Sequence, residues 1–365
     1  MTGTLPLGNP AAMPDPVLDQ QRLNRAVLAR QLLLERSRLP LTETLETVAG
    51  LQTQYAPAGY IGLWSRLEGF RRPSLTAALE DRAVVQATVM RATIHMVSAA
   101  DYWPFALATR PSREQWYLRA AAAQLRGVDM DRAARRVRAD LGDGPRRHDE
   151  LIAGLAEEGI PRTAWNGIAQ LIHLVRVPPS GTWEQRRANR YALAEQWLGE
   201  PAIDEPAAIV HLVRRYLAGF GPASRADVAS WTGLQASALK PALEALDLRR
   251  FRDSDGRELI DLPDAPLPDG DVPAPVRFFP TWDANMLVHA RRTGILPEAY
   301  RPRLFSPKTP HSFPTFLVDG AVAGTWRYED GRVLLDPFEE LAPRQRRAVD
   351  EEAQRLAAWH TENGT

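Results

Sequence analysis

The sequence contains no cysteine, which excludes disulfide bonds, thiolate catalysis and cysteine-ligated zinc or iron–sulfur sites. It has no run of about 18 apolar residues, the length that a transmembrane helix needs. The first 16 residues are rich in proline and glycine and lack a charged segment followed by an apolar one, so no secretory signal is predicted. These absences together predict a cytoplasmic protein that does not enter a membrane.

Neither sign of charge is in excess, because 45 basic residues balance 45 acidic ones. A nucleic-acid-binding protein usually carries a basic excess, so this balance argues against DNA binding unless the charges are segregated. Only two of the basic residues, Lys240 and Lys308, are lysines. The others are arginines, whose planar guanidinium suits phosphates and guanine edges.

Metal-binding patterns are missing as well. None of the seven histidines belongs to a His-x-x-x-His or His-Glu-x-x-His motif. We therefore predict no metal site, and nothing in the sequence calls for a cofactor.

The chain has 365 residues, of which 44% are hydrophobic, enough for a large core and about two to four domains. Apolar residues at helical spacing predict helices over residues 23–34 and from Thr42 onward. Two β-prone runs, residues 84–90 and 92–97, follow them and predict a hairpin. Helices followed by a short hairpin are typical of a winged helix-turn-helix unit.

A similar order of helices and hairpin recurs twice along the chain. Asp-Gly turns at 319–320 and 330–331 then predict hairpins near the C-terminus. We predict an α+β fold, mainly α, with three tandem winged helix-turn-helix units and a C-terminal β-rich segment. The predicted parts are a flexible tail (1–18), winged helix 1 with the Gln-x-Gln motif (19–125), winged helix 2 (126–200), winged helix 3 (201–265), and a β-rich region with a terminal helix (266–365).

Two glutamines, Gln52 and Gln54, lie one residue apart near the end of the second predicted helix. On a helix, residues two apart point about 200° away from each other. Both can line one pocket only if the helix ends or bends here, and Pro57 and Gly59 predict such an end. The alternative is an ordinary solvated helix end.

Five stretches of the sequence resemble the AlkZ/YcaQ family of winged-helix DNA glycosylases, and they span nearly the whole chain. They are Gly-Leu-Gln-Thr-Gln at 50–54, Met-Arg-Ala-Thr-Ile-His at 90–95, Pro-Pro-Ser-Gly-Thr-Trp at 178–183, Gly-Phe-Gly-Pro-Ala at 219–223 with Trp-Thr-Gly-Leu at 231–234, and Phe-Leu-Val-Asp-Gly at 316–320 with Gly-Thr-Trp at 324–326. Each stretch alone is weakly specific, but their order together is fairly specific for the family.

The resemblance implies three tandem winged helices around a concave DNA-binding surface and an active site at Gln52 and Gln54, as in the AlkZ-like Gln-x-Gln branch. It implies excision of alkylated purines, including bulky adducts and interstrand crosslinks, and a link to self-resistance in producers of DNA-alkylating natural products. The expected partner is double-stranded DNA with alkylated purines, bound by a monomer at the nucleoid. The chain departs from the family at Thr53, usually hydrophobic, and at Ala92, which replaces the glycine of an Arg-Gly-Thr-x-His pattern.

Glutamines suit a substrate whose glycosidic bond is already weak. An N7- or N3-alkylated purine is cationic and leaves as a neutral base, so little acid catalysis is needed. Two side-chain amides can then fix the attacking water at C1′ and place carbonyl dipoles near the developing sugar cation. A lyase would need an amine, and neither lysine is near the motif in sequence, so we predict a monofunctional enzyme.

Six further residues are candidates for DNA binding. Arg91, Thr93 and His95 alternate along a β-prone run and are predicted to share one strand face. The others, Arg186, Arg187 and Arg190, lie in the predicted second wing. Trp183 is either a core residue or a stacking wedge, and the core is favoured. Asp283 resembles a catalytic acid but is preferred as part of a structural ion-pair cluster with the nearby Asn285, His289, Arg291 and Arg292.

Two other functions fit part of the sequence. Winged helices are most often found in regulators, so the chain is alternatively a non-catalytic DNA-binding protein, but a regulator would not need the Gln-x-Gln pair. A third interpretation is a protein that sequesters a toxic natural product without binding DNA.

Overall fold

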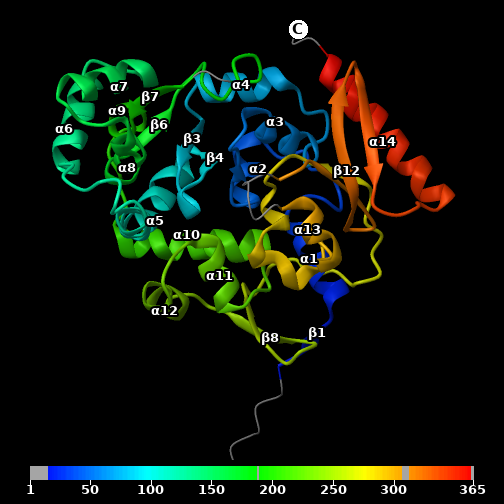
Figure 1. The fold of residues 1–365 in the computed structure, drawn as a ribbon. Helices are drawn as coiled ribbons and strands as arrows, with labels where there is room; N and C mark the ends of the chain where they lie inside the picture. The colour runs from blue at the N-terminus through cyan, green and yellow to red at the C-terminus, as the bar shows by residue number, and fades with distance from the viewer. Residues whose placement is uncertain (1–14, 187–188, 306–311, 363–365) are drawn as a thin grey trace, which may run out of the picture.

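A six-stranded antiparallel sheet lies at the centre of the molecule, which adopts a mixed α/β fold (Figure 1). The computed structural model describes residues 15–186, 189–305 and 312–362. The strand order is β2-β4-β3-β6-β7-β5. These strands are β2 (Leu51–Gln52), β3 (Val84–Thr88), β4 (Ile94–Ser98), β5 (Arg146–Arg147), β6 (Leu174–Arg176) and β7 (Arg190–Leu193).

The predicted hairpin over 84–97 is confirmed, since β3 pairs with β4. The predicted recurrence of a hairpin in the next unit is also present, as β6 pairs with β7. The structure adds a pairing that the sequence did not predict, in which β3 hydrogen-bonds to β6 through Gln86 opposite Arg176. The predicted units 19–125 and 126–200 therefore share one sheet. Their division into winged helix-turn-helix units remains a prediction.

Helices surround this sheet. The most extensive helix–helix interface is between α10 and α5, which pack along each other beneath the sheet (Figure 1). Buried Phe105, Tyr216 and Trp231 fill the space between α5, α10 and α11 (Arg225–Thr232). The helices around the six-stranded sheet are α1 (Gln20–Arg30), α2 (Leu41–Thr47), α3 (Ala56–Trp64), α4 (Arg72–Glu80), α5 (Ala99–Ala120), α9 (Ala194–Leu198) and α10 (Glu205–Phe220).

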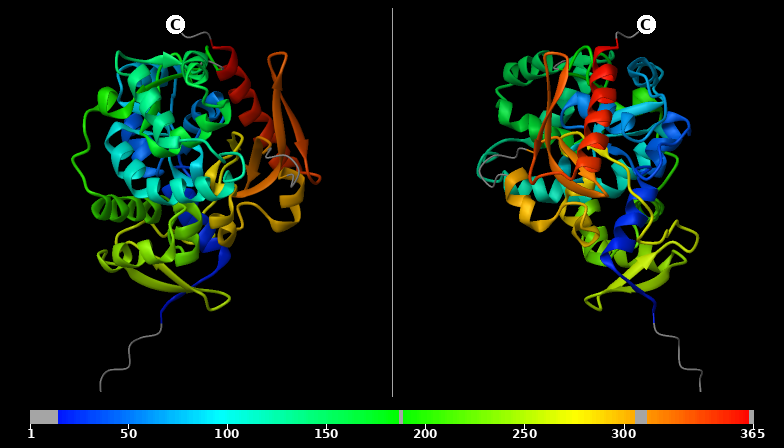
Figure 2. Two further views of the ribbon diagram at one scale, coloured as in Figure 1. Left: turned by 60° about the vertical axis from the view of Figure 1, so that its left-hand side comes forward. Right: turned by 90° about the vertical axis from the view of Figure 1, so that its right-hand side faces the viewer.

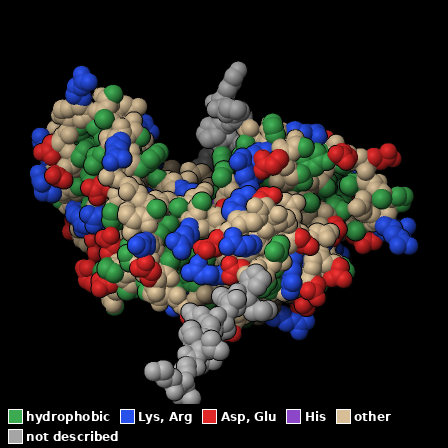
Figure 3. Space-filling view, turned by 90° about the horizontal axis from the view of Figure 1, so that it is seen from below, with side chains coloured by type: hydrophobic (Ala, Val, Ile, Leu, Met, Phe, Trp, Pro, Cys, Tyr) green, Lys and Arg blue, Asp and Glu red, His purple; other side chains and the backbone are tan. Residues whose placement is uncertain are grey.

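Three helices, α6 (Met130–Asp140), α7 (His148–Glu157) and α8 (Trp165–Leu171), form a lobe at one side of the molecule (Figure 1). They have their own small core, in which Val137 and Leu151 are fully buried. Seen from below, the surface is hollowed between lobes, and basic and acidic side chains are mixed across it (Figure 3). On this face the arginines are therefore not segregated from the carboxylates.

The third predicted unit contains α11 (Arg225–Thr232), α12 (Ala236–Glu244) and the hairpin of β8 (Arg249–Asp253) and β9 (Glu258–Asp261). The prediction of a flexible tail over 1–18 is wrong at its end, because β1 (Val17–Leu18) pairs in parallel with β8. Leu18 is the physical reason, since it is buried against the apolar side of this hairpin. Residues 1–14 lie outside the described part of the chain.

The C-terminal region is β-rich as predicted, with the sheet order β10-β11-β12-β13 and the long helix α14 (Pro343–Thr361) packed on it (Figure 2). Both Asp-Gly turns are confirmed, because Asp319 and Asp330 and the glycines after them have positive φ. The remaining elements are β10 (Arg277–Phe279), η3 (Ala284–Met286), η4 (Val288–Thr293), η5 (Glu298–Tyr300), α13 (Arg301–Leu304), β11 (Thr315–Val318), β12 (Ala321–Glu329) and β13 (Arg332–Pro337). Across the described ranges, no helix is long and apolar enough to cross a bilayer.

Candidate active site

The glutamine pair does not lie on a helix, so that prediction is wrong. Helix α2 ends at Thr47, and Ala49 and Gly50 then adopt left-handed conformations, with φ of 60° and 78°. These residues turn the chain into β2, which pairs with β4. A side chain at Gly50 would also approach Val97 to 2.8 Å, so the turn requires glycine for two reasons. Pro57 does not stop a helix but lies in the first turn of α3, where its missing N–H is harmless.

Gln52 ends β2, and Gln54 lies two residues beyond it in a bend. Gln52 is buried, and its Oε1 accepts a hydrogen bond of 2.9 Å from Nη2 of Arg91. Gln54 is exposed, and its Oε1 accepts one of 3.0 Å from the backbone N–H of Ile94. Neither Nε2 group bonds to any residue that the structure describes. Each amide therefore has a fixed orientation and two unused donors.

Arg91 connects the glutamine segment to the middle of the protein. It lies in η1 (Met90–Ala92), between β3 and β4, where Arg91 and Ala92 both have left-handed φ, 53° and 56°. Besides Gln52, its guanidinium contacts the carbonyl of Trp231 and Nε2 of His95, the latter at 3.4 Å. Burial lowers the pKa of Arg91 to about 10, so the group is still cationic at neutral pH.

His95 lies in β4, directly opposite Gln52. Its Nδ1 is 3.0 Å from the carbonyl oxygen of Thr93, to which it donates, so its Nε2 accepts from Arg91. Burial and the nearby Arg91 charge lower the pKa of His95 to about 3. His95 is therefore neutral in the physiological range and is not a proton donor to a leaving group.

The structure brings Arg91, Thr93 and His95 together beside Gln52, but not along one strand. Strand β4 begins only at Ile94, so Arg91 reaches His95 from the preceding turn. The prediction of one shared strand face is therefore wrong in its geometry. Whether the three residues contact DNA remains a prediction.

Of the three arginines in the second wing, one lies next to the glutamine segment. Arg186 donates to the hydroxyl of Tyr55 at 3.1 Å and covers the ring of Trp183, at 4.7 Å from its centroid. Tyr55 directly follows Gln54, so this loop adjoins the site. Arg190 lies in β7 and contacts the carbonyl of Pro145 instead, in the direction of β5. Arg187 lies outside the described residues.

Comparison with known proteins assigns this arrangement to a family. The profile of the family described as "DNA glycosylase AlkZ-like" matches residues 45–359, most of the chain. The chain belongs to this family. It is thus an enzyme that acts on N-glycosidic bonds of DNA.

A curated relative of this AlkZ-like chain is the "Interstrand DNA cross-link repair glycosylase" of Streptomyces sahachiroi. The two are 23% identical over 90% of this chain and 93% of the relative. The solved structure of Streptomyces sahachiroi DNA glycosylase AlkZ superposes with a TM-score of 0.78, at 18% identity over 94% of this chain and 97% of that one. The likeness extends over the whole fold.

The residues predicted to be structural in this AlkZ-like glycosylase have buried protein partners. Trp183 is buried, with ring centroids 5.7 Å from Tyr60 and 5.2 Å from Trp359. Asp283 is buried with Arg66, their charged atoms 2.9 Å apart. The core position of Trp183 is confirmed. Asp283 does form a buried ion pair, but its charged partner is Arg66 and not the expected Arg291 or Arg292, which pair with Glu298 and Asp227.

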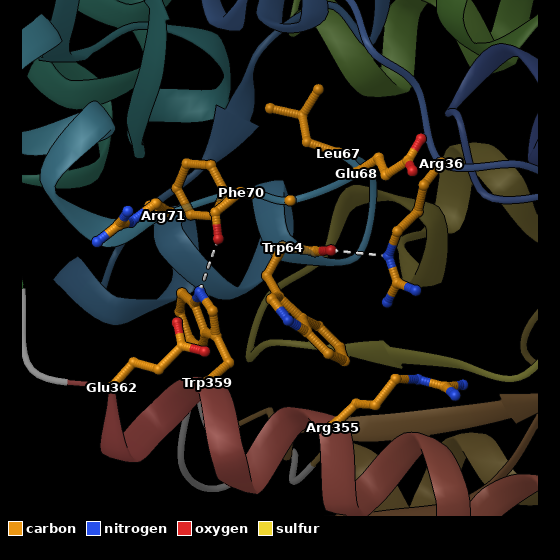
Figure 4. Close-up of a pocket in the computed structure, with 10 residues that line it drawn as sticks. Arg36, Trp64, Leu67, Glu68, Phe70, Arg71, Arg355, Trp359 and Glu362 are labelled. Carbon is orange, nitrogen blue, oxygen red and sulfur yellow. Dashed lines mark hydrogen bonds between the residues drawn. The ribbon is translucent and has the colours of Figure 1, made fainter.

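A pocket of about 850 Å³ among the described residues does not include either glutamine. It lies between α14 and the segment after α3, where Trp64 and Trp359 form an apolar floor and Arg36 and Arg355 project from one side (Figure 4). Arg36 donates to the carbonyl of Trp64 at 3.0 Å, and Trp359 donates to that of Phe70 at 3.0 Å. Volume alone therefore does not locate the active site here.

Residues that sequence reasoning missed border the site. Tyr55 is 48% exposed and directly follows Gln54. Its position next to the predicted glutamine motif was the one sequence feature that could have made it a candidate. Trp231 supplies a carbonyl to Arg91 from 140 residues away, which no local pattern could indicate. A smaller pocket of about 310 Å³ adjoins Arg91 and includes Trp116.

Proposed function

We propose that the protein is a monofunctional DNA glycosylase that excises cationic N7- or N3-alkylpurines, including bulky adducts and interstrand crosslinks. The family assignment supports the reaction class, and the name of the Streptomyces sahachiroi relative supports crosslinked DNA as a substrate. The single observation that carries the site assignment is the pair of amides at Gln52 and Gln54, each held by one N–H donor. We expect a monomer that acts on the nucleoid DNA in the cytoplasm.

The reaction needs water, a route for its proton and a leaving base. Water adds to C1′ as the bond from C1′ to the purine nitrogen breaks, the bonding pair goes to the purine, and one proton is released. A cationic alkylpurine takes that pair and becomes neutral, so no protein acid is required. The neutral, fully hydrogen-bonded His95 agrees with this chemistry.

The two glutamines have different tasks in this proposal. Oε1 of Gln54 accepts only from a neutral backbone N–H, so it remains the better acceptor for the proton of an attacking water. Oε1 of Gln52 is polarised by the Arg91 guanidinium and is the weaker acceptor. Its Nε2 donor is available for an oxygen of the lesion's deoxyribose.

The experiment is excision of N7-methylguanine from duplex DNA, with alkaline cleavage to reveal abasic sites. Wild type is compared with the double variant Gln52→Ala, Gln54→Ala, and we expect excision by wild type only. Wild-type rates in the double variant would disprove the role of the pair. Absence of cleavage by both proteins leads to a DNA-affinity titration, in which failure to bind damaged duplex would contradict the proposed function.

Monofunctional action is tested by borohydride trapping. Lys240 lies on α12, pairs with Glu244 and is largely exposed, and Lys308 lies outside the described residues. We expect no covalent protein–DNA adduct, because a Schiff base requires an amine at the reacting sugar. A trapped adduct would instead identify a lyase.

A further inference from the structure

Tyr55 is an exposed aromatic residue that directly follows Gln54, and the proposed reaction does not use it. Its side chain is 48% exposed, and no aromatic ring of the described residues packs on it. Its hydroxyl oxygen accepts a hydrogen bond of 3.1 Å from Nη1 of Arg186, which is 131 residues farther along the chain. A phenol that accepts in this way still has its own proton to donate, and no described residue takes it.

The backbone that carries Tyr55 is held from the protein side. Tyr55 immediately precedes α3, in which every residue is buried. The residue before it is also anchored, because Oε1 of Gln54 accepts from the N–H of Ile94 at 3.0 Å. The hydroxyl of Tyr55 is therefore presented from a firm support, which lowers the entropic cost of binding a group to it.

Arg186 is held more firmly than an exposed arginine usually is. Its Nε donates to the carbonyl of Trp183 at 3.1 Å, and its guanidinium lies 4.7 Å from the centroid of that buried ring. Its Nη1 donates to Tyr55. These contacts restrict the rotamers of a normally flexible side chain before any ligand binds. Nη2 has no partner among the described residues, so it remains available beside the hydroxyl of Tyr55.

The charges around this pair favour an anion. Arg72 contacts the same Trp183 ring, with its Cζ 5.0 Å from the centroid. In the described part of the chain, neither Arg72 nor Arg186 forms an ion pair, although Glu184 is exposed in the same segment as Arg186. Burial, together with the charges of Arg72 and Arg186, lowers the pKa of His360 to about 4. The positive potential of the two arginines is therefore not cancelled by their neighbours.

The free donors match a phosphodiester. Its two non-bridging oxygens are acceptors only, and tyrosine hydroxyls and arginines are both regular donors to DNA phosphates. The bond from the Arg186 cation polarises the hydroxyl of Tyr55 and makes it a stronger donor to such an anion. Consecutive Cα atoms are about 3.8 Å apart, so a deoxyribose held at Gln54 brings one of its own phosphates close to Tyr55.

We propose that Tyr55 and Arg186 clamp a single phosphate of the damaged nucleotide. The hydroxyl of Tyr55 donates to one non-bridging oxygen, and Nη2 of Arg186 donates to the other. This inference rests on the proposed glycosylase function and makes both side chains positioning residues for it. A fixed phosphate fixes the attached sugar, so that C1′ faces the water at Gln52 and Gln54. Neither clamp residue touches the reacting atoms.

The test replaces a charged phosphate by a neutral one. Duplexes with one N7-methylguanine carry a methylphosphonate at the 5′ or at the 3′ phosphate of that nucleotide, and an unmodified duplex is the reference. For wild type, one of the two neutral linkages is expected to lower kcat/KM by about tenfold or more, the effect of losing hydrogen bonds to a charged group. In the double variant Tyr55→Phe, Arg186→Ala, the same linkage should cost less than about twofold, because the contact is already gone.

Tyr55→Phe alone removes only the hydroxyl and should lower kcat/KM on the unmodified duplex by about tenfold. Tyr300→Phe is the matched control, because it also removes a hydroxyl that donates to a charged group, here Glu339 of the C-terminal region. This control should keep the wild-type rate and the full sensitivity to the neutral linkage. Wild-type rates in Tyr55→Phe together with a loss in Tyr55→Ala would overturn the clamp, since the ring would then act by stacking.

Failure of the clamp is distinguishable from failure of the reaction. Excision by wild type that is lowered by neither linkage, or by the same factor in wild type and the double variant, would refute the clamp and leave the glycosylase. If wild type excises no lesion, the proposed function fails, and equilibrium binding of the same three duplexes decides the clamp. Weaker binding of one methylphosphonate duplex by wild type, but not by the double variant, would support it. Equal affinities for all three duplexes would refute it.

Discussion

Nη2 of Arg91 lies 2.9 Å from Oε1 of Gln52, and this bond fixes the orientation of the glutamine amide. The same guanidinium also reaches His95 and the carbonyl of Trp231. One cation thus orients Gln52 and connects it to the core beside α11. We expect the orientation of the glutamine to depend on the rigid, planar fork of arginine, because the ammonium of lysine is a compact charge on a flexible stem with no fixed donor directions.

Arg91→Lys is therefore expected to reduce excision of N7-methylguanine by about tenfold, since lysine keeps the charge but not the fork. The measurement is the single-turnover rate, with the Tm recorded to confirm folding. Arg82→Lys is the control, because Arg82 also donates to a backbone carbonyl but is exposed and contacts Trp197 instead. An unchanged rate in Arg91→Lys would show that the orientation of Gln52 does not depend on the guanidinium.

Gln54→Glu tests the acceptor role of this side chain. A glutamate can still accept from the N–H of Ile94, and its carboxylate is a stronger acceptor for the water proton. We expect excision to persist and to rise with pH as the carboxylate ionises, around its ordinary pKa of about 4.3. If the variant were inactive at every pH, the Nε2 donor would be the important group and our assignment of the two glutamines would be reversed.

Ala92 adopts a left-handed φ of 56° at the position that is glycine in the Arg-Gly-Thr-x-His pattern of the AlkZ/YcaQ family. We expect Ala92→Gly to raise the free energy of unfolding by about 0.5–1 kcal/mol, because relief of the strain exceeds the added flexibility of the unfolded chain. Urea denaturation measures this. Ala78→Gly, in the ordinary helix α4, is the opposite control and should destabilise by about 1 kcal/mol.

The buried His95 predicts a pH dependence of stability. Its pKa is about 3 when folded and about 6.5 when unfolded, so below about pH 6.5 the unfolded chain binds a proton that the folded chain does not. The free energy of unfolding should therefore fall as pH decreases from about 6.5 toward 3. His95→Gln should make the curve less steep between about pH 6.5 and 5 by the contribution of one proton, while the slope that other histidines with lowered pKa values, such as His173, His289 and His360, contribute remains. Parallel curves for the two proteins would contradict this prediction.

Arg186 is the described wing arginine closest to the glutamine segment, through Tyr55. Arg186→Ala is expected to weaken binding of undamaged duplex and to reduce the salt dependence of log K by about one unit, the effect of one lost phosphate contact. Arg327→Ala is the control, because Arg327 is similarly exposed but lies on β12 of the C-terminal sheet. Fluorescence anisotropy at several salt concentrations measures both. Equal salt slopes in wild type and Arg186→Ala would exclude a phosphate contact.

Sequence patterns correctly predicted those elements of the fold that form between residues close together in the chain. The hairpin of β3 and β4 and the Asp-Gly turns follow from β-prone runs and turn residues, and both are present. Strand β2 was mistaken for a helix end because two residues are too few to show an alternating pattern. The pairing of β3 with β6 joins residues about 90 positions apart, and no local signal encodes it.

For the candidate site too, the sequence predicted individual residues but not the contacts between distant parts of the chain. Gln52 and Gln54 were predicted as a site from their spacing together with the family resemblance. Arg91 and His95 were predicted as candidates for DNA binding, and the structure places both beside Gln52. The bond from Arg91 to Trp231 and the proximity of Trp116 depend on helices α11 and α5, so they required the folded structure. Spacing predicts which residues are candidates, but packing decides which of them meet.

The strand pairing between β3 and β6 has a mechanical consequence for damaged DNA. Gln52 lies in the first strand of the six-stranded sheet, and the loop that carries Arg186 joins two strands farther along it. Continuous backbone hydrogen bonds leave no hinge between these two places. If DNA contacts both places, as we propose, the duplex rather than the protein must bend, and lesions that already weaken base stacking should lower the free-energy cost of that bending.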